Sequence, residues 1–393
     1  MKRPGRRDLR AATRLVHSGE HRPRMARTVP PPIVKGSTVL VGKARALYDG
    51  SELTYGLAGL ATHQALKAAL SDLENAKGVE LFPSGLAAIT GAMLAVLKAG
   101  DEVLVTDACY RPTRRFCDHV LRRFGVGVSY HPAEASPEAI LAAASRATRL
   151  IVLESPGSLS FEMQDVLSIA ALARARGILT LMDNTWAAGL LFQPLVHGVD
   201  LSVQALTKYV GGGSDLFMGS VAAKDPNVLR ALESQVRDLG WAVSPEDAYQ
   251  MLRGLRSLDA RLRRHAESAL AVALWLTGRE EVAEVLHPAL EGAAGHEIWK
   301  RDYQGACGLF GFVLRPGSKP AVEAFLDALE IFGLGFSWGG YESLAIDAGN
   351  QLSSRIHPTR FAGPVLRLSI GLEDPDDLIA DLEKGFSAVA ADK

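Results

Sequence analysis

Cysteine is scarce in this 393-residue sequence, which contains only Cys109, Cys117 and Cys307. Three thiols cannot form a disulfide framework, and an odd number fits a reducing compartment, so we expect a cytoplasmic protein. The ten histidines form no HExxH motif and no close cluster with cysteine. The sequence therefore predicts no metal site.

The sequence also has no excess of positive or negative charge. The 43 lysines and arginines and the 44 aspartates and glutamates leave a formal charge of −1, so no overall field favours nucleic acid or an anionic membrane as a partner. The longest compact apolar run, residues 269–276, is far shorter than the roughly 20 residues that cross a bilayer. The basic N-terminal sequence leads into no apolar stretch, so we expect no secretory signal.

The remaining class is a globular protein long enough for two or three domains. Residues 1–60 contain few periodic segments, and the Val-Pro-Pro-Pro run at 29–32 favours extended structure because proline has no amide hydrogen. We expect an arm that lies over another surface, since Ile33, Val34 and Leu40 need burial.

Helical and strand patterns alternate over residues 61–255. This alternation predicts βαβ units and a mostly parallel sheet in a large α/β domain. The chemistry of such a sheet collects at the carboxyl ends of its strands. The expected strands cover 79–82, 102–106, 150–153 and 178–182, and the expected helices cover 61–73, 86–97, 137–148 and 165–176.

Residues 256–393 are expected to form a smaller α+β domain. The pattern predicts a long helix over 244–278, with a bend at Gly254, as the connection to it. Ser244 and Pro245 suit the start of this helix. Further strands are expected near 306–314 and 365–370, and further helices near 320–330 and 375–388.

Two segments of the α/β region suit pyridoxal phosphate chemistry. Asp183 follows a buried-looking strand, and Lys208 lies between Thr207 and a tyrosine, just ahead of three glycines at 211–213. This cofactor needs a lysine amine for a Schiff base, a carboxylate that keeps the pyridine nitrogen protonated and small donors for its phosphate. Taken singly, the aspartate could be a helix cap, the lysine a surface residue and the glycines a turn.

In this order the segments resemble the Cys/Met-metabolism family of pyridoxal-phosphate enzymes. The resemblance runs from TRLVH at 13–17 to RLSIGLED at 367–374. It implies the α/β fold of aspartate aminotransferase, with a mostly parallel seven-stranded sheet in the large domain and a smaller α+β C-terminal domain. It also implies a homotetramer of two tight dimers, in which a neighbour's arm completes each active site.

Two further motifs are similar to the bacterial cystathionine β-lyase branch of this family. They are SPGSL at 155–159 and FSWGGYES at 336–343. Other branches more often have SPxNP at the first place and lack the tryptophan at the second. The branch implies β-elimination from L-cystathionine to homocysteine, pyruvate and ammonia. Without the resemblance, Trp338 and Tyr341 would be interpreted as core aromatics.

The resemblance also assigns the cofactor-binding residues. Lys208 matches the Schiff-base lysine, whose freed amine then takes the Cα proton. Neighbouring cationic and aromatic groups should lower its pKa. Asp183 matches the partner of the pyridine nitrogen, and Tyr110 matches the aromatic that stacks on the ring. Gly85 and Leu86 match backbone donors to the phosphate at a helix start.

The substrate is expected at an arginine of the C-terminal domain. Arg367 matches the guanidinium that binds the substrate α-carboxylate, where a bidentate fork fixes orientation better than a lysine. Ser337, Trp338 and Phe336 match residues that shape this carboxylate pocket. The resemblance therefore implies a small-molecule amino-acid substrate.

The phosphate end departs from the family pattern. Thr207 supplies a hydroxyl, but the arm motif Tyr-x-Arg, which reaches in from a neighbour, reads Tyr55-Gly56-Leu57 here. Tyr55 is retained and is assigned to the catalytic residues together with Lys208 and Tyr110. The arginine that binds the phosphate in many members is missing.

Two more departures lie near the lysine. Ala205 and Gly213 stand where many members have serine and histidine. We therefore expect looser cofactor retention than is usual in the family, unless His63 replaces the missing charge. Cys109 and Cys117 have no evident base partner and are interpreted as structural.

Other functions remain open from the sequence. A γ-elimination or γ-replacement enzyme would share the fold but needs a second deprotonation at Cβ, and Phe336 and Trp338 favour the β-lyase only by resemblance. A lyase for another cysteine S-conjugate is a further alternative. A non-catalytic cofactor-binding module would keep the fold alone. A nicotinamide enzyme is disfavoured because no GxGxxG follows the early strands.

Overall fold

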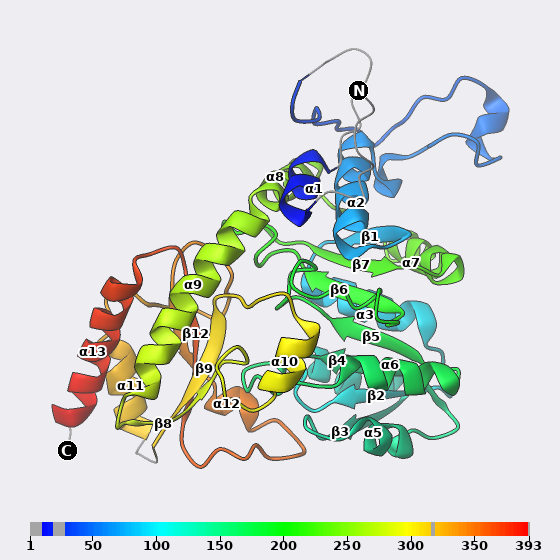
Figure 1. Cartoon of the computed structure of the whole chain (residues 1–393). Helices are drawn as coiled ribbons and strands as arrows, with labels where there is room; N and C mark the ends of the chain where they lie inside the picture. The colour runs from blue at the N-terminus through cyan, green and yellow to red at the C-terminus, as the bar shows by residue number, and fades with distance from the viewer. Residues whose placement is uncertain (1–9, 19–27, 316–318, 392–393) are drawn as a thin grey trace.

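The computed structural model describes residues 10–18, 28–315 and 319–391, and its strands form two sheets (Figure 1). Parts of the expected arm, residues 1–9 and 19–27, therefore lie outside the described residues. Within the described ranges, no helix combines the length and the apolar character needed to span a membrane.

The larger sheet has seven strands and carries the carboxyl edge at which the site was expected. Strand β7 runs antiparallel to both of its neighbours, and the other four strand pairs are parallel, so the sheet is mostly parallel, as the sequence predicts. The strands lie in the order β1 (Gly78–Phe82), β7 (Gly219–Ala223), β6 (Leu201–Ala205), β5 (Leu179–Asp183), β4 (Thr148–Glu154), β2 (Glu102–Thr106) and β3 (Gly127–His131).

Helices cover both faces of this sheet, and alternate side chains of each strand pack against them. In β2, Leu104 belongs to one hydrophobic cluster, whereas Val103 and Val105 belong to another. The first cluster includes α2 (Ala61–Glu74), α5 (Pro137–Ala143), α6 (Val166–Ala175) and α8 (Pro245–Arg256), and the second includes α3 (Gly85–Val96), α4 (Arg111–Phe116), η4 (Cys117–Leu121) and α7 (Pro226–Asp238). A short turn, η5 (Arg122–Phe124), follows η4.

Two helices differ from the prediction. Helix α5 is shorter than expected, because β4 already begins at Thr148. The long helix expected over 244–278 is two helices, α8 and α9 (Leu258–Thr277), and the break is at Ser257 rather than at Gly254. Gly254 instead permits close packing, since a Cβ there would lie 2.3 Å from the carbonyl oxygen of Val210.

The smaller sheet forms the C-terminal α+β unit. Its core contains Phe310, Phe312, Phe325 and Phe386, which pack against α9. The strands lie in the order β10 (Gly333–Leu334), β11 (Leu344–Asp347), β12 (Val365–Ser369), β9 (Leu309–Leu314) and β8 (Val282–Leu286), and the helices are α10 (His296–Asp302), α11 (Lys319–Asp327), α12 (Gly349–Leu352) and α13 (Pro375–Ala391).

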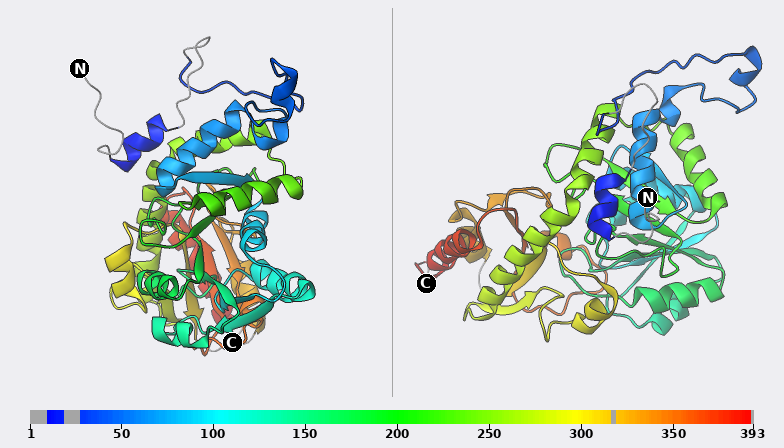
Figure 2. Two further views of the ribbon diagram at one scale, coloured as in Figure 1. Left: turned by 90° about the vertical axis from the view of Figure 1, so that its right-hand side faces the viewer. Right: turned by 45° about the horizontal axis from the view of Figure 1, so that its top comes forward.

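The N-terminal region projects from this body. Helix α1 (Ala11–His17) packs on α2, α8 and α9, but the segment 28–58 extends away from both sheets (Figures 1 and 2). It contains two short turns, η2 (Ala44–Leu47) and η3 (Gly56–Ala58). Leu40 is 91% exposed and Tyr48 is 92% exposed. Within one chain, the large side chains of Leu40 and Tyr48 are therefore left almost fully exposed.

Candidate active site

The candidate site lies where four neighbouring strands end. Asp183 is the last residue of β5, and it is in register with Glu154 at the end of β4 and with Val203 in β6. Tyr110 follows β2, and Lys208 follows β6. The sheet therefore brings together residues that are far apart in the sequence, as a parallel sheet requires.

Lys208 lies between the end of β6 and the loop at 336–340, which precedes β11 of the smaller sheet. Its Nζ donates a hydrogen bond to Ser337 Oγ at 2.9 Å and lies 5.2 Å from the ring centroid of Trp338. Burial and the positive charge of Arg367 lower the pKa of Lys208 to about 8, against the opposing effect of Asp183. The lysine amine is thus available in its neutral form closer to neutrality than an exposed lysine.

Asp183 is held by the turn that follows it. Its Oδ1 accepts hydrogen bonds from the backbone N–H of Thr185 at 3.0 Å and from the Thr185 hydroxyl at 2.5 Å. Thr185 Oγ1 in turn accepts the backbone N–H of Ala205 at 2.9 Å. Burial raises the pKa of Asp183, and the bonds from Thr185 and the charge of Lys208 oppose that rise. The carboxylate is therefore fixed in position and oriented into the site.

Tyr110 presents its ring at the same edge. The side chain is 43% exposed, and its backbone N–H donates to Glu154 Oε2 at 2.6 Å. Burial, followed by the charges of Asp183 and Glu154, raises the pKa of the Tyr110 phenol. The phenol is therefore neutral near pH 7, and the side chain remains partly exposed at the site.

The start of α3 provides two unused backbone donors. Ser84 caps the helix by accepting the N–H of Ala87 at 3.0 Å, which leaves the amides of Gly85 and Leu86 without an intrahelical acceptor. A Cβ on Gly85 would lie 2.4 Å from the Cβ of Ala205, so the helix start packs directly on the end of β6. Free amides at a helix start favour an anion.

Thr207 is engaged within its own loop. Its hydroxyl donates to the carbonyl of Met218 at 3.2 Å and accepts the N–H of Met218 at 3.0 Å. These two bonds close the glycine-containing loop after Lys208. Of the expected phosphate donors on the chain, the two amides at the start of α3 are therefore the ones left open.

Arg367 lies on β12 with its guanidinium directed at the loop before β11. Nη1 donates to the Phe336 carbonyl at 3.0 Å and Nη2 donates to the Gly335 carbonyl at 2.8 Å. Its buried Nε has no hydrogen-bond partner among the described residues. Burial lowers the pKa of Arg367 to about 10. This is a desolvated cation that an incoming carboxylate can pair with.

The pocket loop packs tightly on the lysine. Trp338 contacts Tyr209 with ring centroids 5.5 Å apart, whereas Phe336 is 79% exposed. A Cβ on Gly339 would lie 3.1 Å from the carbonyl carbon of Lys208, and its φ of +80° also favours glycine. The loop that carries Trp338 and Gly339 thus packs directly on the backbone of the lysine.

Tyr55 lies apart from these residues within one chain. It belongs to the projecting arm, is 56% exposed and forms an isolated bridge with Thr38. Leu57 follows it in η3. None of the hydrogen bonds of Tyr55 among the described residues involves another predicted site residue.

A family model described as Cys/Met metabolism PLP-dependent enzyme matches residues 12–387. The chain belongs to this family. It is therefore an enzyme that depends on pyridoxal phosphate, and its α/β architecture is the fold of that family.

Several known members are similar to this Cys/Met-metabolism enzyme. A Rhizobium johnstonii protein with the provisional name cystathionine beta-lyase is 48% identical over 385 residues, covering 96% of each chain. Cystathionine beta-lyase MetC of Escherichia coli is 39% identical over 394 residues, covering 97% of this chain and 99% of its own. The solved structure of cystathionine gamma synthase from Xanthomonas oryzae pv. oryzae, in complex with aminoacrylate and cysteine, has a TM-score of 0.90 and is 32% identical. The match covers 98% of this chain and 99% of the Xanthomonas chain.

The residues of this family member fit its cofactor. The open amides of Gly85 and Leu86 suit a phosphate, and the pKa of Lys208, lowered to about 8, suits an amine that bonds to an aldehyde carbon. The orphaned Nε of Arg367 suits a carboxylate in the same pocket. Among the described residues, no group of three or more His, Cys, Asp or Glu side chains is arranged to hold a metal ion.

His63 does not replace the missing arm arginine. Its Nδ1 accepts the N–H of Leu60 at 3.1 Å, and its Nε2 donates to the Val243 carbonyl at 2.8 Å. Both ring nitrogens are used, and the ring is buried. The expectation that this histidine could bind the phosphate is therefore wrong, because the side chain fixes the start of α2 instead.

Sequence reasoning missed two residues of the site. Thr185 orients Asp183, and a hydroxyl two positions after a strand-end aspartate was the available signal. Glu154 accepts the amide of Tyr110, and its place directly before the SPGSL motif could have drawn attention to it. The contact between Thr185 and Asp183 is local, whereas the contact between Glu154 and Tyr110 depends on how neighbouring strands are registered and does not follow from residue spacing.

Proposed function

We propose that this enzyme is a carbon–sulfur lyase that cleaves L-cystathionine by β-elimination to homocysteine, pyruvate and ammonia. One observation carries the proposal: the loop with Ser337 and Trp338 contacts the amine of Lys208 and also receives Arg367, so one pocket combines a base with a carboxylate-binding cation. The names of the Rhizobium and Escherichia relatives support the choice of substrate.

Arg367 would orient the substrate. The carbonyls of Phe336 and Gly335 hold its two Nη atoms from behind, and this fixes the plane of the guanidinium. Its remaining hydrogens can then bind the substrate α-carboxylate in a bidentate geometry. Fixing the carboxylate places Cα at a defined distance from Lys208. Holding the two reacting groups in this geometry raises the rate of proton transfer.

Lys208 would move the proton. Its amine, with a pKa of about 8, accepts the Cα proton, and Ser337 Oγ at 2.9 Å holds Nζ in place. Pyridoxal phosphate, when bound, supplies the electron sink for the charge left on Cα. Asp183 would keep a proton on the pyridine nitrogen, Tyr110 would stack on the ring, and the start of α3 would hold the phosphate.

The bond from Cβ to sulfur then breaks, and the homocysteine thiolate leaves with the electron pair. The three-carbon fragment that remains is hydrolysed to pyruvate and ammonia. A γ-elimination or γ-replacement would need a second deprotonation at Cβ. That reaction is the second candidate, because the Xanthomonas structure of similar fold is named a gamma synthase.

We also propose a cytoplasmic homotetramer with shared active sites. The exposed apolar arm, with Leu40 and Tyr48 almost fully exposed, suits packing on a second copy of the chain. In that arrangement a neighbour's Tyr55 would complete the site. The division into an arm over 1–60, a cofactor-binding domain over 61–255 and a C-terminal domain over 256–393 is proposed on the same basis.

The reaction is tested by identifying the keto acid formed when the reconstituted enzyme is incubated with L-cystathionine. Pyruvate together with homocysteine would support β-elimination. 2-Oxobutyrate together with cysteine would contradict it and favour the γ-reaction. The control is Lys208→Ala, which should abolish keto-acid formation while leaving the thermal unfolding temperature nearly unchanged.

Cofactor retention is a separate prediction of the proposed site. Leu57 replaces the usual arm arginine and His63 is occupied, so the phosphate lacks one cation. We expect pyridoxal phosphate to be lost on exhaustive dialysis, and we expect Leu57→Arg to lower the Kd on titration back into apoprotein about tenfold. A sub-micromolar Kd for the unaltered chain would contradict this prediction.

A further inference from the structure

Two carboxyl groups stand side by side at the end of the large sheet. Glu154 ends β4 and Asp183 ends β5, and the two residues are direct register partners. Both side chains are largely removed from solvent, and two like charges so close are costly. Asp183 has a role toward the cofactor, whereas nothing described so far requires Glu154.

Glu154 acts on the loop that carries Tyr110. Its Oε2 accepts the Tyr110 N–H at 2.6 Å, while the Tyr110 carbonyl accepts the N–H groups of Thr113 and Arg114 in α4 at 2.9 and 3.2 Å. The backbone of Tyr110 is thus held on both sides. Because the ring itself is 43% exposed, its position is set mainly by this backbone.

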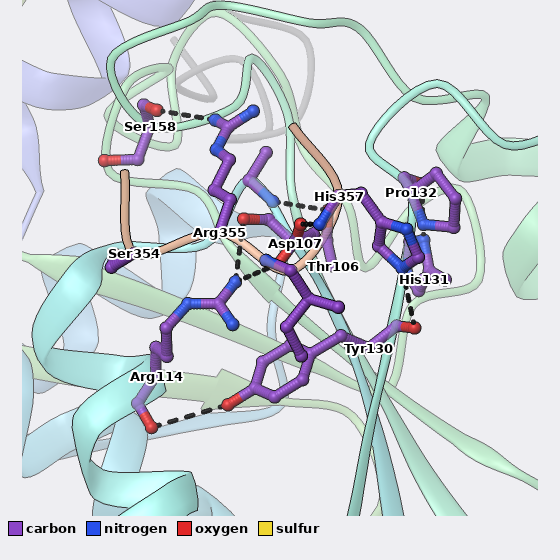
Figure 3. Close-up of polar contacts among 12 residues, drawn as sticks. Thr106, Asp107, Arg114, Tyr130, His131, Pro132, Ser158, Ser354, Arg355 and His357 are labelled. Atoms are coloured by element: carbon purple, nitrogen blue, oxygen red, sulfur yellow. Dashed lines mark hydrogen bonds and ion pairs between the residues drawn. The ribbon is translucent and has the colours of Figure 1, made fainter. Parts of the chain in front are cut away.

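The surrounding loops keep Glu154 and Tyr110 together. The backbone N–H of Ser158 donates to the Ala108 carbonyl at 2.8 Å, and Gln164 Oε1 accepts the N–H of Glu154 at 3.3 Å. Arg355, from the segment before β12, donates to the Ser158 carbonyl at 3.1 Å (Figure 3). The β4 loop is therefore bonded to the β2 loop and to the C-terminal domain.

The β2 loop is bonded to the same segment of the C-terminal domain. Asp107 accepts the N–H of His357 at 2.6 Å and of Ile356 at 3.2 Å, and it pairs with buried Arg114 (Figure 3). With these contacts at one end of the loop and Glu154 at the other, Tyr110 has little freedom to move relative to the sheet.

We propose that Glu154 is a positioning residue that fixes the ring of Tyr110 against the cofactor by accepting the Tyr110 amide. The inference rests on the stacking role of Tyr110 given under the proposed function, but not on the identity of the substrate. Burial and the charge of Asp183 raise the pKa of Glu154, and the hydrogen bond from the Tyr110 amide opposes that rise. The contact that carries the proposal is the hydrogen bond that Glu154 Oε2 accepts from the Tyr110 N–H.

The test compares Glu154→Gln with Glu154→Ala in the holoenzyme. The amide oxygen of glutamine can still accept the Tyr110 N–H, so this variant keeps the visible-region circular dichroism of bound pyridoxal phosphate and the kcat of the unaltered enzyme. The alanine variant loses much of that dichroism, and its kcat falls about tenfold, as expected for the loss of one positioning hydrogen bond. KM changes by less than about twofold, because Arg367 is untouched.

A matched control separates positioning from folding. Glu102, at the opposite end of β2, also accepts two side-chain hydrogen bonds, from Ser145 and Thr148 at 3.0 Å each. Glu102→Ala should lower the thermal unfolding temperature without changing the dichroism. Unchanged dichroism in Glu154→Ala, or equal losses in both Glu154 variants, overturns the proposal. The dichroism needs no substrate, so failure of the cystathionine assignment would be seen separately.

Discussion

Lys208 and Arg367 place two cations in one pocket, where the charge of Asp183 acts on Lys208 in the opposite direction to that of Arg367. Burial and the charge of Arg367 disfavour the protonated form of Lys208 and lower its pKa to about 8. An amine with this property can accept a proton near neutrality, whereas an exposed lysine with a pKa near 10.4 cannot do so efficiently. The residue proposed to bind the substrate thus also lowers the pKa of the proposed base.

Arg367→Leu should therefore raise the pKa of Lys208. Removing the positive charge removes one of the two causes that lower it, so the lysine stays protonated to higher pH. We expect the midpoint for incorporation of pyridoxal phosphate into apoenzyme, followed by absorbance, to move to higher pH. Arg367→Lys keeps a charge and should shift the midpoint less. An unchanged midpoint in the leucine variant would exclude the coupling.

Glu74 should make the stability of the protein depend on pH. This buried carboxyl group accepts hydrogen bonds from Ser202 and Gln204, and burial raises its pKa to about 7. The contribution of Glu74 to the free energy of unfolding is most favourable below its unfolded pKa of 4.5. It falls as pH rises, because Glu74 ionises first in the unfolded chain, and it levels off above about pH 7. The Glu74→Gln variant does not lose this contribution, so it should be more stable than the unaltered chain by about 3 kcal/mol at pH 8 and nearly as stable as the unaltered chain at pH 4.5.

The pH dependence of Glu74→Gln is measured by denaturant unfolding at several pH values. The exposed Glu233, paired with Arg237 on α7, provides the control, and Glu233→Gln should show no such trend. A stability difference between Glu74→Gln and the unaltered chain that does not vary with pH would rule out ionisation as the cause.

At the scale of elements, the position of the start of α3 depends on the absence of a side chain at Gly85. In Gly85→Ala the new Cβ would lie 2.4 Å from the Cβ and 2.9 Å from the Cα of Ala205, so the helix start must move away from β6. We expect stability to fall by about 1–3 kcal/mol and the Kd for pyridoxal phosphate to rise about tenfold. Gly278→Ala is the control, because its Cβ meets ordinary contact distances. Equal cofactor affinity in both variants would contradict the prediction.

Many of the helices and strands could be predicted from the sequence. Continuous apolar runs followed by turn residues predicted β1, β2, β4 and β5, and the small residues after β1 predicted the start of α3, whereas β3, β6 and β7 were not predicted individually. The break between α8 and α9 was misplaced, because Gly254 has no local signature that separates a bend from close packing on Val210. Contacts such as Tyr110 to Glu154 depend on strand register, which one sequence does not specify.

At the scale of the whole molecule, the exposed arm predicts self-association. The double variant Leu40→Ser with Tyr48→Ser removes two large apolar side chains that are more than 90% exposed in one chain. Burial of each in an interface would contribute about 1.5–3 kcal/mol, so the dissociation constant should rise roughly a hundredfold or more. Sedimentation over a range of concentrations measures this change.

The control for the arm is another exposed aromatic residue. Phe124 in η5 is 67% exposed and lies outside the arm, so Phe124→Ser should leave the sedimentation coefficient unchanged. If the arm variant sediments like the unaltered chain at every concentration, the arm does not mediate assembly. Loss of activity on dilution of the arm variant would further indicate that sites are shared between subunits.

The three cysteines make the chain well suited to site-specific labelling. Each is buried, and burial raises the pKa of Cys117 and of Cys307 to about 12 and that of Cys109 well above its usual range. Native thiols will therefore react slowly with maleimides. A single cysteine introduced at Tyr48 on the arm could carry a fluorophore or spin label with no need to remove the others, and distances between labelled arms would then report how the subunits are arranged.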